Sequence, residues 1–351
     1  MKKNKIAIVG PYPKPYGGIS IHLQRVLSQL DLHDCPYDFY NESKNSLKAK
    51  NSVQFNNLLS RLLGLLRIAT TSYKLIHYHS PNIFGRLFFC CYGLAGKEVY
   101  IHVHGASLHD IVSKPLQALL AKFFAKYVYI IADNKDIYEL AVSLNPKKVL
   151  LIDAFLPPLV YLEHPEINIY NKYSENVDLV ISMVGWFSEY KGKDLYGFDT
   201  ICEAIKLIKN RINVRILISV NGTQSISIYQ NFLKLIKEME LENNIILITD
   251  DLEDVWPLII NTDIFIRPTC SDGSAVSIKE ALWMDVPVLA SDCVPREADC
   301  DLFKCQSGHD LYEKLLVFYS TRRIMRNIPE KIKATNLKNF KNKLFENVYE
   351  I

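Results

Sequence analysis

Short apolar runs alternate along the chain with longer segments in which apolar residues recur every three or four positions. The first run, residues 5–10, reads KIAIVG and predicts a buried strand. A loop rich in proline and glycine follows, and then a predicted helix whose apolar face carries Ile19, Leu23, Val26, Leu27 and Leu30. A strand, a loop and a helix in this order form the unit from which parallel sheets are built.

The same alternation continues through both halves of the chain. Further strands are predicted at residues 75–78, 99–103, 127–132, 149–152, 178–185, 214–220, 244–248, 264–267 and 286–290. The alternation stops at residues 155–158, which read FLPP, and in the polar stretch 164–176. We therefore expect an α/β protein of two domains, each with a parallel sheet covered on both faces.

Composition agrees with an ordinary folded protein that needs no crosslinks. The chain has 351 residues, of which 49% are hydrophobic and 23% are charged, and its eight cysteines form no CxxC pair. No signal peptide and no uninterrupted apolar run of about 18 residues is present, so we expect a cytoplasmic protein without a transmembrane helix.

Charge and amphipathic patterning single out the first half. Residues 1–165 carry 19 Lys+Arg against 11 Asp+Glu, a net charge of +8, so the rest of a chain whose net charge is +3 carries −5. This offset favours an anionic partner such as a membrane surface or a phosphorylated substrate, and is too small for a nucleic-acid binder. Two Leu-rich stretches, residues 58–69 and 116–127, fit either a lipid interface or a core-facing helix.

Residues 271–292, which read SDGSAVSIKEALWMDVPVLASD, contain the strongest candidates for a functional site. They form a predicted loop and the helix that follows it. Ser277 and Glu280 match a capping box. Asp272 and its neighbours directly follow the predicted strand 264–267, which places them at the carboxyl edge of a parallel sheet. Ligands bind at that edge, and backbone amides at a helix N-terminus favour phosphate.

This segment resembles the donor-binding signature of retaining GT-B glycosyltransferases of family 4, the "group 1" glycosyltransferases. The matching residues are Asp272, Glu280 eight positions later, and the run Pro287-Val-Leu-Ala-Ser291. Three other segments are similar to the family's pattern: the glycine loop at Gly17-Gly18, Val103-His104-Gly105 at a strand end, and Val184-Gly185 with Lys191-Gly192. The resemblance implies two Rossmann-like domains whose parallel sheets face a central cleft.

The resemblance also implies roles for individual residues. His104, Lys191 and Asp272 would form the catalytic set, with Lys191 stabilising the leaving diphosphate and no metal required. The donor-binding set would comprise Gly17, Gly18, Gly185, Lys191, Lys193, Arg267, Gly273, Ser274, Ala275, Val276 and Glu280. Within it Glu280 would bind the ribose, and the amides near Ser274 would hold phosphate.

Two positions depart from the family pattern. Trp186 stands where the family has an arginine on the diphosphate, so Lys193 or Arg267 would have to supply that charge. Asp272 is one methylene shorter than the usual glutamate. These departures indicate a different donor sugar or a loss of activity.

Other interpretations remain open. His77-x-His79 and His102-x-His104 could bind zinc, and Asp299-Cys-Asp301 has the form used by metal-dependent transferases. A nucleotide-sugar epimerase on the same fold, or an inactive scaffold, would share the same motifs.

The sequence thus predicts three segments and one reaction. Residues 1–160 would form the acceptor-side domain, residues 161–332 the donor domain, and residues 333–351 a helix that packs back on the first domain. A sugar would pass, with retention, from a UDP- or GDP-sugar to a hydroxyl of a lipid-linked or other saccharide acceptor. The setting would be bacterial surface polysaccharide synthesis, with the protein peripheral at the inner face of the cell membrane.

Overall fold

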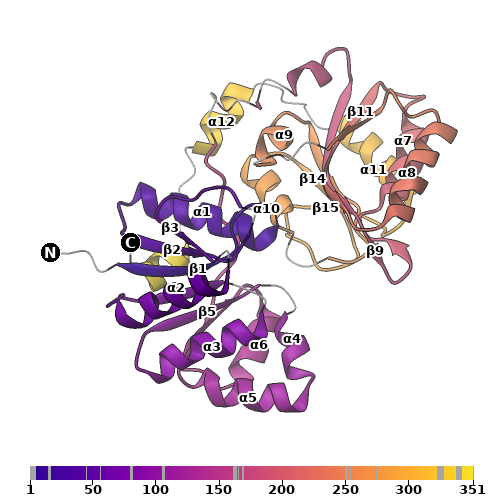
Figure 1. Ribbon diagram of the computed structural model, residues 1–351. Coiled ribbons are helices and arrows are strands. Elements are labelled where there is room, and N and C mark those ends of the chain that lie inside the picture. Colours follow the sequence, from indigo (N-terminus) through magenta and orange to yellow (C-terminus); the bar gives the residue numbers. More distant parts are fainter. Residues whose placement is uncertain are drawn as a thin grey trace. The chain divides into compact units, whose positions relative to one another are not determined.

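The chain forms two compact units, each built on its own parallel sheet (Figure 1). The computed structural model describes residues 5–14, 17–44, 46–55, 57–79, 82–104, 107–160, 164, 166–167, 170–249, 252, 254–272, 275–321, 328–336 and 342–350. Unit 1 comprises residues 1–156 and 340–351, and unit 2 comprises residues 157–339. The division falls close to the boundary predicted after residue 160.

Unit 1 is built on a seven-stranded sheet in which every described pairing is parallel, with the strand order β3-β2-β1-β4-β5-β6-β7. Its strands are β1 (Ile6–Gly10), β2 (Tyr37–Asn41), β3 (Ser52–Gln54), β4 (Ile76–His79), β5 (Val99–Val103), β6 (Tyr129–Ala132) and β7 (Lys148–Leu151). Its α-helices are α1 (Gly18–Leu32), α2 (Leu58–Thr70), α3 (Ile83–Leu94), α4 (Ser107–Val112), α5 (Pro115–Ala125) and α6 (Lys135–Ser143).

Both faces of this sheet are buried, which explains why β1 is apolar at successive positions. Ile6 and Ile8 pack with Leu23 and other residues of α1 on one face. Ala7 and Val9 point to the opposite face, where the core includes residues of α2 to α6. The strand and helix predicted for residues 5–30 are both present.

The end of the chain differs from the prediction of a single helix over residues 333–351. Residues 333–336 belong to α12 (Ile328–Asn336) in unit 2, where Lys331 Nζ donates to the carbonyls of Ile260 and Thr262. The short π-helix η2 (Phe345–Tyr349) lies in unit 1 and buries Phe345 and Val348 in the core on the α1 face. The prediction was wrong about residues 333–336, because the buried lysine fixes them to unit 2.

Unit 2 contains a six-stranded sheet with the order β12-β11-β8-β13-β14-β15, whose described pairings are also parallel. Its strands are β8 (Leu179–Phe187), β11 (Val214–Thr223), β12 (Ile245–Ile248), β13 (Ile264–Arg267), β14 (Val288–Ser291) and β15 (Asp301–Phe303). A hairpin of β9 (Glu189–Tyr190) and β10 (Lys193–Asp194) follows β8. The helices are η1 (Asn171–Tyr173), α7 (Phe198–Ile208), α8 (Ile226–Glu238), α9 (Trp256–Ile260), α10 (Val276–Trp283), α11 (Gly308–Thr321) and α12.

The strand order reverses once in each sheet, between β1 and β4 in unit 1 and between β8 and β13 in unit 2. In open α/β sheets, ligands bind beyond the carboxyl ends of the strands at such a switch point. The α/β class with two parallel sheets is therefore confirmed. Among the described helices, none combines the length and the apolar character that a membrane crossing requires.

Candidate functional site

The carboxyl edge of β13 carries a buried ion pair. Arg267, the last residue of β13, donates from Nε to Asp272 Oδ2 over 2.9 Å and from Nη2 to Asp272 Oδ1 over 3.0 Å. Its Nη1 also donates to the carbonyl of Val184 in the neighbouring strand β8, over 3.2 Å. This bidentate geometry fixes Asp272 directly over the switch point of the unit 2 sheet.

A second arginine, Arg296, binds the same carboxylate. Its Nη1 donates to Asp272 Oδ2 over 2.9 Å, and its Nη2 donates to Thr269 Oγ1 over 3.0 Å. The Arg296 side chain is 2% exposed and the Asp272 side chain 9%. Burial alone would raise the pKa of Asp272, but the charges and hydrogen bonds of the two arginines outweigh it and lower the pKa to about 2. Asp272 is thus ionised at neutral pH and anchors both guanidinium groups.

Helix α10 begins four positions after Asp272, and its start differs from the predicted capping box. The helix runs from Val276, and Ala275 is its N-cap residue, with no side-chain hydrogen bond at the cap. Ser277 therefore lies inside the helix, and the predicted Ser277–Glu280 capping box was wrong. Glu280 is instead 2% exposed and is one of the buried residues of α10, together with Ile278 and Ala281. The predicted donor-binding residues Gly273 and Ser274 lie outside the described residues.

The segment after β8 holds the predicted cations on the surface. Lys191 occupies the turn of the β9–β10 hairpin with a φ of 51°, is exposed, and has its Nζ 5.2 Å from the centre of the Tyr190 ring. Lys193 is also exposed, and its Nζ donates to Gln306 Oε1 over 2.8 Å.

Two other residues of this region have structural reasons for their identity. A Cβ at Gly185 would lie 2.9 Å from Tyr196 Cδ1, so Gly185 is required by packing. Trp186 packs on Gly222, where an added Cβ would lie 2.6 Å from its ring. The tryptophan that replaces the family's arginine therefore fills space against β11.

The predicted site residues of unit 1 lie at two separate places, the glycines at the start of α1 and His104 at the end of β5. Gly17 is the N-cap of α1, and both Gly17 and Gly18 line an open pocket of about 580 Å³ at the carboxyl edge of β1, together with Lys44 and Arg61. An added Cβ at either glycine meets no heavy atom within 4 Å. His104 is the first residue after β5 and is half-buried, with its Nε2 3.2 Å from His79 Nδ1.

Arg296 and Thr269 are the members of the unit 2 site that sequence reasoning missed. Thr269 and Asp272 follow β13, whereas Arg296 follows β14, and β13 and β14 are adjacent parallel strands. Loops that follow adjacent parallel strands meet at one edge of the sheet, so an arginine soon after the predicted strand 286–290 was the available signal. The motif pattern gave no reason to select it.

Comparison with protein-family models gives one match within unit 2. Residues 179–317, from the start of β8 into α11, match the model of the glycosyl transferases group 1. This segment contains Arg267, Asp272, Glu280 and Arg296. No curated protein matches the chain.

Solved structures match nearly the whole chain. HepE of Anabaena in complex with UDP and glucose has a TM-score of 0.63 and 14% identity, over 94% of this chain and 94% of its own. A glycosyltransferase from Rickettsia africae has a TM-score of 0.67 and 14% identity, over 97% of this chain and 95% of its own. WaaG, involved in lipopolysaccharide biosynthesis, has a TM-score of 0.61 and 13% identity, over 95% of this chain and 96% of its own. At these identities the likeness establishes the GT-B fold.

Proposed function

Starting from a GT-B fold whose residues 179–317 match the glycosyl transferases group 1, we propose that this protein transfers a sugar from a nucleotide diphosphate donor to a hydroxyl acceptor. The observation that carries the proposal is the buried carboxylate of Glu280. It lies one turn inside α10, beyond the carboxyl end of β13 at the switch point of the sheet. The first amides of a helix have no acceptor within the helix, so a buried carboxylate one turn further on suits a ligand that carries both phosphate and hydroxyls.

The nucleotide diphosphate is the part of the donor that α10 would hold. The amides of Ala275 and Val276 at the start of the helix would bind phosphate, and Glu280 would accept hydrogen bonds from the ribose hydroxyls. Structures similar in fold include one with UDP-glucose bound, which supports a UDP-sugar as the first donor to test. The uridine base and the glucosyl group are therefore the base and the sugar that we propose to test first.

Charge at the leaving group would come from the β9–β10 hairpin. Lys191 is exposed and, among the described residues, forms no ion pair, so its ammonium can approach a diphosphate as charge develops there. Lys193 would be the second cation, after release of its bond to Gln306. Arg267 suits this role less, because its guanidinium already spans Asp272 and Val184. The transfer step would need no metal at the diphosphate.

The glycine loop of unit 1 suits an acceptor that carries negative charge. Its pocket, about 580 Å³ in volume, is lined by Lys44, which is exposed, and by the ion pair of Arg61 with Glu42 at 3.0 Å, so Lys44 supplies its net positive charge. Gly17 and Gly18 leave the floor of the pocket open. A saccharide linked to a lipid through phosphate has the size and charge that this pocket would accept.

Exposed apolar helices in the same unit support a lipid-linked acceptor. On α2, Leu58 is 84% exposed and Leu63 57%, and on α5 Leu116 is 70% and Phe123 53% exposed. Lys114, Lys122 and Lys126, in and beside α5, are exposed with them. Leucines exposed to this extent on two helices of one unit are uncommon in a protein that meets only water, whereas apolar and basic side chains together suit an anionic membrane surface.

The sequence pattern of α2 and α5 was also consistent with packing in the core. The exposure of their leucines favours binding to a membrane. The protein would then act at the inner face of the cell membrane, in the assembly of a bacterial surface polysaccharide. Retention of configuration, by same-face attack with assistance from the leaving phosphate, is the stereochemistry that the family resemblance implies. The catalytic residues would be His104, Lys191 and Asp272, with Asp272 acting through its fixed position between the two arginines.

A thermal-shift panel of nucleotides and nucleotide sugars tests the proposal. We expect UDP-sugars or GDP-sugars to raise the melting temperature of the protein. When an organic extract of bacterial membranes supplies the acceptor, we expect the protein to transfer the sugar to a lipid-linked saccharide in that extract. An altered nucleotide sugar formed without acceptor would instead identify an epimerase. Stabilisation by no nucleotide would favour a scaffold role, which the replacement of the family's diphosphate-binding arginine by Trp186 would then explain.

A further inference from the structure

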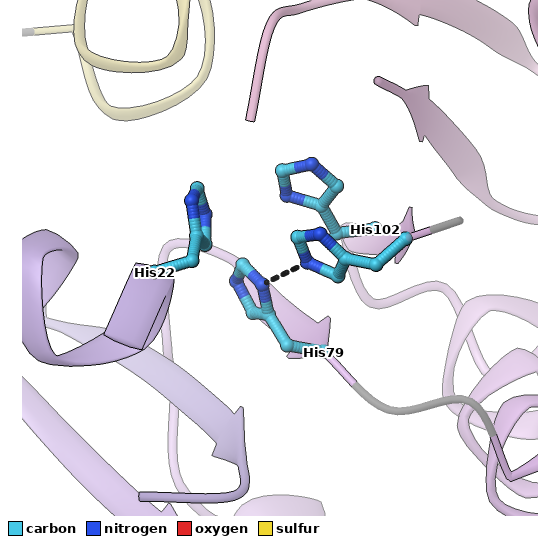
Figure 2. Close-up of side chains that lie close together, drawn as sticks. His22, His79 and His102 are labelled. Carbon is cyan, nitrogen blue, oxygen red and sulfur yellow. Dashed lines mark hydrogen bonds between the residues drawn. The ribbon is translucent and has the colours of Figure 1, made fainter. Parts of the chain in front are cut away.

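Four histidines converge beside the switch point of the unit 1 sheet. His22 comes from α1, His79 is the last residue of β4, His102 lies in β5, and His104 directly follows β5 (Figure 2). His79 and His102 are register partners on adjacent parallel strands. One ring nitrogen from each of the four lies within 4.8 Å of those of the other three.

The rings form a compact group and are not spread along a surface. The centres of the His22 and His102 rings are 5.0 Å apart, those of His79 and His102 are 4.9 Å apart, and those of His102 and His104 are 4.1 Å apart. His22, His79 and His102 are buried and His104 is half-buried. Figure 2 shows the side chains of His22, His79 and His102 lying close together.

Several of the buried ring nitrogens lack hydrogen-bond partners. Within the part of the chain that the structure describes, His22 Nε2, His79 Nε2 and both nitrogens of His102 have none. A buried polar atom without a partner costs about 1–3 kcal/mol. Repetition of this cost at three adjacent side chains indicates that something other than the protein satisfies these nitrogens.

The chemistry of the rings is that of metal ligands. A neutral imidazole carries one ring N–H and one lone pair, and the lone pair can bind a metal ion. His22 Nδ1 lies 2.7 Å from the carbonyl oxygen of Ala154, to which it donates. This bond fixes the tautomer and leaves Nε2 as the lone-pair nitrogen, as an outer hydrogen bond does in known metal sites.

We propose that unit 1 contains a transition-metal site of the zinc class, formed by His22, His79, His102 and His104. In a tetrahedral zinc site with bonds of about 2.0–2.1 Å, neighbouring ligand nitrogens are about 3.4 Å apart. A pair of nitrogens at the 4.8 Å limit would therefore close by about 1.4 Å when the ion binds.

The surrounding charges select the class of metal. Arg25 acts on the His22 ring and Arg86 on the His102 ring, and both cations oppose a bound positive ion. Affinity must then come from bonds to nitrogen, which suits Zn²⁺ and excludes the oxygen-seeking ions Ca²⁺ and Mg²⁺. The site is thus distinct from the diphosphate-bound metal that some transferases use.

The site would also join the end of the chain to the sheet. The His77 ring centre lies 3.9 Å from that of His79, and His77 Nδ1 is hydrogen-bonded to the hydroxyl of Tyr349 in η2 at 2.6 Å. A metal that fixes His79 would therefore support the packing of η2 in unit 1. It would also make His104 a metal ligand, in competition with its proposed contact to the sugar.

Metal analysis of the full chain, purified without added metal, tests the site. We expect about one zinc per chain in the wild-type protein and in the control variant His309→Asn, whose histidine is exposed on α11 in unit 2. His22→Asn and His102→Gln should each lose most of the zinc. Calorimetry with UDP should give the same affinity for the zinc-free and zinc-loaded proteins, which separates this proposal from the proposed transfer reaction.

A second measurement keeps the proposal testable if a variant fails to fold. The wild-type protein is stripped with a chelator, and its melting temperature is followed as Zn²⁺ alone or Mg²⁺ alone is added. A rise with Zn²⁺ but not with Mg²⁺ is expected, because a ligand that binds only the folded state stabilises it. The proposal is overturned if Zn²⁺ causes no rise in wild type, or if a folded His102→Gln retains the zinc.

Discussion

The guanidinium of Arg296 donates to Asp272 Oδ2 over 2.9 Å, although the two residues follow different strands of the unit 2 sheet. Arg267 approaches the same oxygen from the end of β13, also at 2.9 Å. A single carboxylate thus joins the loops that follow β13 and β14. This junction lies directly before α10, the helix that we propose to hold the donor.

Replacing Asp272 by asparagine should remove this junction. Asp272→Asn leaves two buried guanidinium groups without a carboxylate, so we expect the free energy of unfolding at pH 7 to fall by about 3–5 kcal/mol. Urea unfolding measures this change. Asp299→Asn, at an exposed aspartate in the same unit, is the control and should change the free energy by less than about 0.5 kcal/mol.

The same pair predicts how stability depends on pH. The pKa of Asp272 is about 2 in the folded protein and 3.8 in its ordinary state, so the ionised carboxylate contributes about 2 kcal/mol of stability. Because the folded pKa is the lower one, this contribution is complete above about pH 4 and is lost as the pH falls toward about 2. The difference between wild type and Asp272→Asn should shrink over that range. A difference that stays constant would show that the carboxylate is not ionised at neutral pH.

Arg296→Lys tests whether the shape of the guanidinium matters as well as its charge. A lysine can reach Asp272 but cannot also supply the bonds to Thr269 Oγ1 and to the carbonyl of Ser291. We expect a loss of about 1–3 kcal/mol in the free energy of unfolding. The exposed control Arg211→Lys should lose almost nothing, and an equal loss in both variants would count against the network.

Exposed leucines of α2 should control membrane binding. Leu62 is 53% and Leu63 57% exposed, so the double change Leu62→Gln and Leu63→Gln should leave the melting temperature unchanged. Sedimentation with phosphatidylglycerol vesicles should show about thirtyfold weaker binding, because each leucine contributes about 1 kcal/mol when buried in lipid and the two together about 2 kcal/mol. Val317→Gln, at a valine of α11 that is 57% exposed, is the matched control. Equal binding of wild type to anionic and neutral vesicles would show that the exposed lysines do not contribute to membrane binding.

A larger residue in the pocket of unit 1 should leave the melting temperature unchanged but should reduce sugar transfer. A leucine at Gly18 meets no atom within 4 Å of its Cβ, so Gly18→Leu should melt at the wild-type temperature while its side chain enters the pocket. We expect sugar transfer to membrane extract to fall by about tenfold, which corresponds to about 1.4 kcal/mol, with donor binding unchanged. Ala95→Leu, an exposed position of the same unit, should transfer normally. Normal transfer by Gly18→Leu would exclude the pocket as the acceptor site.

The apolar strands could be predicted from sequence because they are buried on both faces. Residues 99–103 and 264–267 were predicted at their observed bounds, as β5 and β13. Strand β2 was missed because it reads YDFYN, with two polar residues that would ordinarily mark a loop. Asp38 is buried there only because Lys5 pairs with it at 2.7 Å and Tyr73 donates to it at 2.5 Å. Such long-range partners leave no local pattern.

The candidate site shows the same limit. The position of Asp272 after a strand was predicted from the local pattern, whereas its partner Arg296 lies on a loop that only the sheet brings near. The capping box failed for the related reason that a Ser-x-x-Glu match is local, while the burial of Glu280 depends on how α10 packs. The histidine cluster needed His22, a lone helical histidine, to be placed against two strands by tertiary structure.

Calorimetric titration of UDP and GDP into Glu280→Gln tests the central claim most directly. We expect wild type and Glu297→Gln, whose carboxylate pairs with Lys279 at 3.7 Å, to bind one of these nucleotides with equal affinity. Glu280→Gln, folded as judged by its melting temperature, should bind it at least about tenfold more weakly, since a charged hydrogen bond is worth about 1.5–3 kcal/mol. Unchanged nucleotide binding by Glu280→Gln, or no binding of either nucleotide by wild type, would contradict the assignment of the donor site to α10.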